Sequence, residues 1–90
     1  MYAIKTTAQF RRDLRTVKKR GYDIDLLTEV VKKIAAGETL DKRYNDHSLK
    51  GKYEGYRECH ITPDWLLIYK ISDTTLILGL TRTGTHSDMF

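Results

Sequence analysis

The sequence has little of what marks secreted, disulfide-bonded or membrane proteins. Cys59 is its single cysteine, so no disulfide can form within the chain. No apolar run approaches the roughly 20 residues that cross a membrane, and the N-terminus lacks the apolar stretch of a signal peptide. We therefore expect a cytoplasmic protein without membrane contact. Cys59 lies in a strand-like segment, which favours a small apolar filler over a reactive thiol, because nothing nearby in the sequence would activate it.

The residue groupings that build common metal centres are also missing. The three histidines are far apart in the sequence, and Cys59 has no companion. Zinc sites usually include at least one close pair of ligands, so zinc is disfavoured. The acidic residues do not cluster, which disfavours a magnesium-dependent nuclease centre even more. We expect no bound metal and no cofactor.

The chain is short and basic. Its 90 residues, 40% of them hydrophobic, are enough for one small core, which predicts a single domain over residues 1–90. Sixteen Lys and Arg against twelve Asp and Glu give a formal net charge of +4. This balance favours a polyanionic partner, because neutralising phosphates releases counterions. The alternative is a basic protein that is simply well solvated.

The first half of the chain predicts one strand and two helices. Residues 2–5 are typical of a short strand, and Thr6 opens a capping-box pattern at a helix start. Gly21 would end this helix, whereas Asp23 would cap a second helix that ends at Gly37. The short connection predicts an antiparallel hairpin. Each helix has one apolar stripe, made of Phe10, Leu14 and Val17 in the first and Leu27, Val30, Val31 and Ile34 in the second.

The second half predicts strands. Residues 38–55 show little apolar periodicity, and a connection this long is usually functional or disordered. Strand signals follow at residues 56–61, 65–71 and 75–82, with short turn-forming connectors that predict an antiparallel meander. The order β-α-α-β-β-β therefore predicts an α+β fold, with a two-helix hairpin packed on one face of an antiparallel sheet.

The side chains best suited to chemistry lie in the C-terminal half. His47 is in the long connection, His60 in a strand and His86 in the polar tail. Imidazoles exchange protons near neutral pH, and RNA carries its own nucleophile, the ribose 2′-hydroxyl. A base, an acid and a cation such as Arg82 could therefore cleave RNA. Each residue also has an ordinary interpretation: a solvated loop, a strand-packing partner, a disordered tail and a surface charge.

Aromatic side chains offer further contacts for RNA. Trp65 opens the most apolar strand, where core packing is the commoner role of a tryptophan. Stacking on an unpaired base is the alternative, and Tyr53, Tyr56 and Phe90 could serve similarly.

The polar face of the first helix is too charged to pack in a core. A solvated face is the usual role of such a charge run. Our hypothesis is that this face binds ribosomal RNA phosphates, because a small cleft needs a larger surface to position its substrate. Its cations are Arg11, Arg12, Arg15, Lys18 and Lys19.

Three motifs occur in a fixed order in the C-terminal half. They are D-H-x-L-x-G from Asp46, G-Y-R-x-x-H-x-x-P-D-W-x-L-I-Y from Gly55, and R-x-G-[ST]-H-x-x-x-F ending at Phe90. Together they resemble the RelE superfamily of bacterial type II toxins, and within it the YafQ-like branch. The resemblance covers residues 45–90, and the first half of the chain agrees only in its two-helix layout.

The resemblance implies a ribosome-dependent mRNA interferase that is inhibited by a cognate antitoxin. Operator DNA would be bound only through the antitoxin complex. Tyr53 and Met89 stand where this branch often has tryptophan and leucine, and both keep the bulk. The family's active-site positions fall here on His47, His60, Asp64, Arg82, His86 and Phe90, with Trp65 adjoining.

Two other functions fit part of the pattern. ParE-like relatives share this architecture and poison gyrase without catalysis, and an RNA-binding module would explain the charge and the aromatics. Neither explains why His60, Arg82 and His86 occur together, so we favour an mRNA endonuclease that acts on the ribosome. The spacing leaves open whether His60 or His86 is the base, and whether a histidine or Asp64 is the acid.

Overall fold

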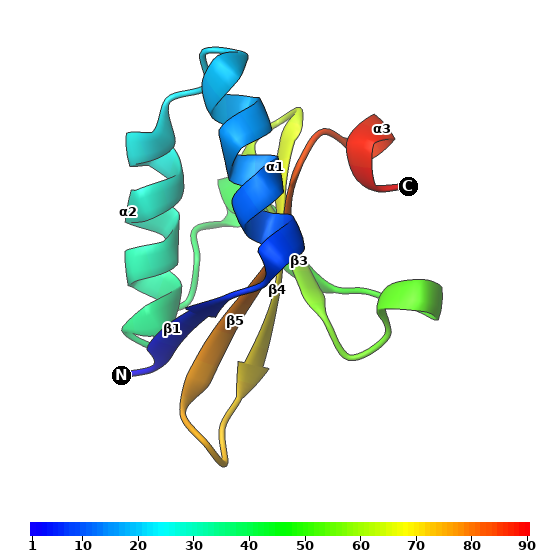
Figure 1. The fold of residues 1–90 in the computed structure, drawn as a ribbon. Coiled ribbons are helices and arrows are strands. Elements are labelled where there is room, and N and C mark those ends of the chain that lie inside the picture. Colours follow the sequence, from blue (N-terminus) through cyan, green and yellow to red (C-terminus); the bar gives the residue numbers. More distant parts are fainter.

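A mixed sheet with two helices on one face makes up the computed structural model, which describes residues 1–90 (Figure 1). The helices α1 and α2 lie side by side as a hairpin, and α3 is a single turn near the C-terminus. The predicted α+β class and helix hairpin are confirmed. The elements in chain order are β1 (Ala3–Thr6), α1 (Ala8–Lys19), α2 (Ile24–Ala35), η1 (Lys42–Tyr44), β2 (His47–Ser48), η2 (Gly51–Tyr53), β3 (Arg57–Thr62), β4 (Trp65–Ser72), β5 (Ile77–Gly84) and α3 (His86–Met89).

The sheet corrects the prediction of a wholly antiparallel arrangement. Its strand order is β1-β5-β4-β3-β2. The neighbours from β2 to β5 are antiparallel, as the meander predicted, but β1 runs parallel to β5. Tight turns force successive strands to be antiparallel. In contrast, 70 residues separate the end of β1 from the start of β5, so no turn fixes their relative direction. Sequence order therefore left the direction of β1 open.

The helix boundaries follow local capping chemistry. Thr7, not Thr6, caps α1, because its hydroxyl accepts a hydrogen bond from the backbone amide three residues later at 2.9 Å. Thr6 still belongs to β1, so the predicted capping box was wrong by one residue. Asp23 caps α2 as predicted. Gly21 and Gly37 follow the helix ends with φ of 85° and 81°, a conformation that glycine adopts without strain.

The segments without clear periodicity are ordered. Residues 38–55 contain η1, β2 and η2, and the polar tail forms α3 instead of being disordered. The last strand begins at Ile77, two residues later than predicted, because Leu76 has a positive φ of 54° and belongs to the turn. None of the helices has the length and apolar character needed to cross a membrane.

Both faces of the sheet are covered by apolar side chains. In β4, Trp65, Leu67 and Tyr69 belong to the main core beneath α1 and α2. The residues between them, Leu66 and Ile68, face the other side. They form a smaller cluster with side chains from η2 and α3, namely Tyr53 and Met89. The alternation is the expected period of two along a strand.

Two side chains whose roles the sequence left open are core residues. Trp65 is 2% exposed, donates from Nε1 to the Thr83 hydroxyl at 2.8 Å and packs edge-on against Tyr22. The structure therefore shows the commoner role, core packing, and the alternative of Trp65 as a substrate-binding residue that stacks on a base is wrong, since its ring does not reach solvent. Burial raises the pKa of Cys59 to about 12, so this thiol stays neutral and is an apolar filler, as predicted.

One buried carboxylate joins α1 to β5. Asp13, which is 8% exposed, accepts hydrogen bonds from Arg82 Nε at 2.9 Å and Arg82 Nη2 at 3.0 Å. The backbone amide of Thr83 and the side chain of Gln9 also donate to it. Burial by itself would raise the pKa of Asp13, but these bonds outweigh burial and hold the pKa below its usual range. The ionised carboxylate therefore stabilises the fold.

We expect Asp13→Asn to lower the free energy of unfolding at pH 7 by about 1–3 kcal/mol, the usual cost of losing bonds to a buried charged group. The folded-state pKa lies below the unfolded value of about 3.9. The stabilisation is thus fully present above about pH 4 and is lost as the pH falls through the folded pKa. Urea unfolding of wild type and variant at pH 7 and pH 3 measures this.

The difference between the two proteins should shrink at pH 3. Asp25→Asn, at an exposed position in the first turn of α2, is the matched control and should have a smaller effect. A stability loss of equal size at both pH values would show that Asp13 acts through packing and not through its charge.

Candidate active site

The register of the sheet aligns candidate residues in a row across four strands. His47 on β2 lies opposite Glu58 on β3. Glu58 lies opposite Ile68 on β4, and Ile68 lies opposite Arg82 on β5. Directly paired residues project to the same side of a sheet. The row therefore brings a histidine, a carboxylate and an arginine to one face, although they are far apart in sequence.

A second row lies beside the first. His60 on β3 pairs with Leu66, and Leu66 pairs with Gly84 at the end of β5. The chain then turns into α3, whose first residue is His86. This path explains how a strand histidine and a tail histidine reach the same place.

A bulge in β5 decides which side chain enters the first row. Tyr69 pairs with Leu80, whereas the preceding Ile68 pairs with Arg82, so Thr81 is the extra residue. In a regular ladder Thr81 would stand opposite Ile68. Bulges commonly re-aim a side chain in this way next to functional sites.

A surface hollow of about 430 Å³ gathers three of the predicted catalytic residues: His60, Asp64 and His86. Asp64 reaches it from the turn between β3 and β4. The hollow offers two imidazoles and a carboxylate around one space, which is the arrangement that proton transfer to and from one ligand requires. Its other lining residues are Tyr22, Pro63, Leu66, Thr85 and Ser87.

Glu58 is a residue that sequence reasoning did not single out. Its carboxylate is buried, and its Oε1 lies 3.5 Å from His47 Nε2 and 3.6 Å from His60 Nε2. The shared carboxylate connects His47 to the hollow, which His47 itself does not line. The signal was its spacing of two residues from His60, which puts both side chains on one strand face.

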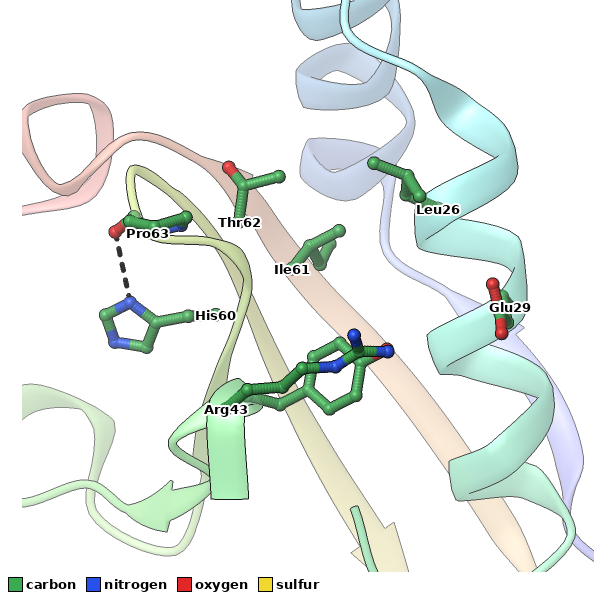
Figure 2. A pocket seen from close by; sticks show the side chains of 8 residues that line it. Leu26, Glu29, Arg43, His60, Ile61, Thr62 and Pro63 are labelled. Atoms are coloured by element: carbon green, nitrogen blue, oxygen red, sulfur yellow. Dashed lines mark hydrogen bonds between the residues drawn. The ribbon is translucent and has the colours of Figure 1, made fainter. Parts of the chain in front are cut away.

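Backbone carbonyl groups set which imidazole nitrogen carries the hydrogen in His47 and His60. His47 Nδ1 lies 2.7 Å from the Asn45 carbonyl oxygen, and His60 Nδ1 lies 3.2 Å from the Pro63 carbonyl oxygen (Figure 2). A carbonyl oxygen only accepts, so Nδ1 donates its proton in both contacts. In the neutral ring Nε2 is then the nitrogen without a hydrogen, and in both residues it faces Glu58.

The C-terminal turn is fixed to the domain by charge. Thr85 and Asp88 form a capping box at the start of α3. Arg20 at the end of α1 donates to both carboxylate oxygens of Asp88, at 2.6 and 3.0 Å, and these bonds hold the pKa of Asp88 well below its usual range. In the same turn His86 stacks on Phe90, with ring centroids 4.7 Å apart. Phe90 is 56% exposed, so its ring is available to a ligand.

Arg82 lies outside the hollow. Its guanidinium lines a smaller depression together with Asp13 and Asp88. The hydrogen bond to Asp13 raises the pKa of Arg82, which therefore keeps its charge at all working pH values. Asp13 occupies Nε and one N–H of Nη2, so the Nη1 donors have no part in this pair.

The basic face of α1 is exposed, as predicted. Two of its members make local bonds: Arg11 donates to Thr6, and Arg12 donates to Gln9. The remaining cations are free of such contacts among the hydrogen bonds and ion pairs of the structure, namely Arg15, Lys18 and Lys19. Binding of RNA by this face stays a prediction.

Comparison with known proteins gives the family. A family model described as a bacterial toxin of type II toxin-antitoxin systems, YafQ, matches residues 2–90. The mRNA interferase toxin YafQ of Escherichia coli K12 is 36% identical over 88 residues, covering 97% of this chain and 94% of the relative.

Solved structures agree over the whole chain. The crystal structure of a metal-bound toxin from Helicobacter pylori superposes with a TM-score of 0.94 at 42% identity and covers 100% of both chains. A chain of the E. coli DinJ–YafQ complex superposes with a TM-score of 0.89 at 36% identity, covering 100% of this chain and 99% of its own.

The sequence motifs resembled this family only over residues 45–90, whereas the family model matches residues 2–90. The family model includes both helices, and the fold agrees with solved members. The predicted class of enzyme, an mRNA interferase, is the one that the name of the E. coli relative states. The chain belongs to the YafQ family of bacterial toxins from type II toxin-antitoxin systems.

Proposed function

We propose that this protein is the toxin of a toxin-antitoxin pair and cleaves mRNA on the ribosome. The observation that carries the proposal is the meeting of His60, Asp64 and His86 around one hollow. Three groups able to exchange protons, brought together from β3, a turn and α3, are what cleavage of an RNA phosphodiester needs. The name of the E. coli relative supports the same reaction.

In the proposed reaction the ribose 2′-oxygen attacks the adjacent phosphorus while its proton passes to a base. The bond from phosphorus to the 5′-oxygen breaks, and this oxygen takes a proton from an acid. The products are a 2′,3′-cyclic phosphate and a 5′-hydroxyl. His60 or His86 is the base, and a histidine or Asp64 is the acid. Nε2 is the reacting atom of His60, because its Nδ1 faces a carbonyl oxygen.

Two further residues complete the proposed site. Arg82 stands in the row of the sheet next to the one that holds His60 and Leu66, so we place its Nη1 donors against phosphate oxygens at the edge of the hollow, where they stabilise the charge that builds there, while Asp13 holds the other side of the guanidinium. Phe90 offers an exposed ring for stacking on a base. The basic face of α1 would bind ribosomal RNA phosphates and so position the small hollow over its substrate.

A cognate antitoxin is the proposed inhibitor. The E. coli YafQ is known in complex with DinJ, and we extend this type of partner to the present chain. Operator DNA would be contacted only by the complex of toxin and antitoxin.

A non-enzymatic toxin and an RNA-binding module are the alternatives. A protein with either of these functions would keep its activity when His60, Asp64 or His86 is replaced, since binding alone depends on charge and shape. The contact of two imidazoles with buried Glu58 favours the enzyme. Burial of a carboxylate costs free energy unless a cation compensates its charge, and a protonated imidazole supplies that cation.

We expect His86→Ala to fold normally but to lose mRNA cleavage by about 100-fold or more, the usual loss when general acid or base catalysis is removed. Cleavage of mRNA on purified ribosomes and growth arrest after expression measure the effect, and ribosome binding serves as the control. A folded variant that still arrests growth fully would remove His86 from the mechanism.

We expect Glu58→Gln to slow cleavage by about tenfold or more while ribosome binding is unchanged, because a carboxylate 3.6 Å from the reacting Nε2 of His60 favours the protonated imidazole that forms in the chemical step. Glu54→Gln, at an exposed position nearby, is the matched control. The rate under saturating ribosomes decides the matter: equal rates for the two variants would make Glu58 a structural residue only.

Metal dependence is the third test. One Helicobacter relative is a metal-bound toxin, but no group of three or more His, Cys, Asp or Glu side chains is arranged to hold a metal ion here. The 2′-hydroxyl also supplies the nucleophile without one. Dialysis of the toxin against EDTA should leave cleavage on ribosomes at fixed magnesium unchanged, and elemental analysis checks removal. Activity that falls with loss of a stoichiometric metal would contradict this mechanism.

A further inference from the structure

A second hollow lies on the other side of His60, and the reaction proposed above makes no use of it. It measures about 280 Å³, close to the lower end of about 300 Å³ for small-molecule sites. It lies between α2 and the segment from η1 to β3 (Figure 2). His60 and Pro63 line both hollows, so the two spaces adjoin at the proposed reacting imidazole.

Arg43 gives this hollow a flat, charged wall. Its guanidinium carbon lies 4.8 Å from the centre of the Tyr44 ring, and its Nη2 donates to the Tyr44 hydroxyl at 2.8 Å. Tyr44 is buried and covers one face of the guanidinium. Arg43 is exposed and lines the hollow, and guanidinium planes are surfaces on which unpaired bases stack.

The opposite wall is apolar and acidic. Leu26 is an exposed apolar side chain of α2, and the buried Ile61 of β3 also lines the hollow. Glu29 contributes a carboxylate, whose one ion-pair partner is Lys33 at 3.6 Å. A phosphate would be repelled by this carboxylate. The N–H groups on the edge of a base would instead be accepted by Glu29 and by the Thr62 hydroxyl.

We propose that this hollow binds the base of an unpaired RNA nucleotide adjacent to the scissile phosphate. The proposal rests on the mRNA cleavage proposed above and adds a site that contributes to substrate choice. The phosphodiester lies at His60 in the first hollow. The neighbouring base turns over His60 and Pro63 into the second hollow, stacks on Arg43 and donates to Glu29.

Arg43→Gln tests the stacking wall, with Lys42→Gln as the matched control. Both changes remove one positive charge from η1, but the Lys42 side chain does not line the hollow. Cleavage is measured on ribosomes programmed with intact mRNA and with mRNA that has an abasic site next to the scissile phosphate. Arg43→Gln should raise KM on intact mRNA about tenfold, within the usual worth of one stacked base, with kcat little changed.

The abasic substrate should raise the KM of the wild type by a similar factor. It should add little to the effect of Arg43→Gln, because both changes remove the same contact. Lys42→Gln should behave as the wild type on both substrates. Equal effects of the two variants, or independent effects of Arg43→Gln and the abasic site, would overturn the base site. Weaker antitoxin binding by Arg43→Gln with unchanged cleavage would do so as well.

Glu29→Gln separates a base from a phosphate in the hollow. With a base bound, the variant should discriminate less among the four bases at this position and should not lower KM. A lower KM on every sequence would mean that a phosphate occupies the hollow, because the change removes a repelling charge, and the proposal would fail.

A binding measurement keeps this result separate from the proposed cleavage. The probe is a trinucleotide RNA with a 2′-deoxy substitution at the scissile position, which cannot be cleaved. Titration into the labelled wild type should shift the amide resonances of Ile61 and Thr62, and Arg43→Gln should reduce this response about tenfold in affinity. No response at these amides overturns the base site even if cleavage is found. A response without any cleavage on ribosomes would instead reject the enzyme and keep the base site.

Discussion

The ion pair between Asp13 and Arg82 is the contact on which the arrangement of the site depends. It joins the middle of α1 to the centre of β5, where the bulge has turned Arg82 toward the first row. The same helix ends at Arg20, whose bonds to Asp88 fix α3. One helix thus positions both the cation of the proposed site and the turn that carries His86. Its packing on the core makes these positions rigid.

The sheet makes the second contribution, because its register converts distant sequence positions into neighbours. The strand β4 has apolar residues on both faces, and Leu66 and Ile68 form the floor between β3 and β5. The candidate side chains lie around this floor. Backbone carbonyl groups orient some of them by hydrogen bonds, as the Pro63 carbonyl does for His60. The imidazoles of His47 and His60 already lie within 3.6 Å of the Glu58 carboxylate, and His86, stacked on Phe90, lines the same hollow as His60.

His60 divides the surface into two spaces of different chemistry. One is lined by two imidazoles and a carboxylate, the other by a guanidinium beside a tyrosine ring, apolar side chains and a carboxylate. A single RNA strand crossing His60 would place its phosphate in the first and its base in the second. Chemistry and recognition would then be separate in space but share one residue, so that a correctly bound base also orients the scissile bond.

The sequence by itself determined the two helices, the meander and the family. Apolar periods, the cap at Asp23 and the glycines at helix ends depend on neighbours a few residues apart, and three motifs identified the histidines. Only the tertiary structure decided the parallel pairing of β1, the burial of Trp65, the position of Glu58 between two histidines and the partner of Arg82. These depend on which distant residues meet across strands and between helix and sheet. Local sequence patterns carry no information about contacts between distant residues. Packing and strand register determine these contacts, and both are set only when the whole domain has folded.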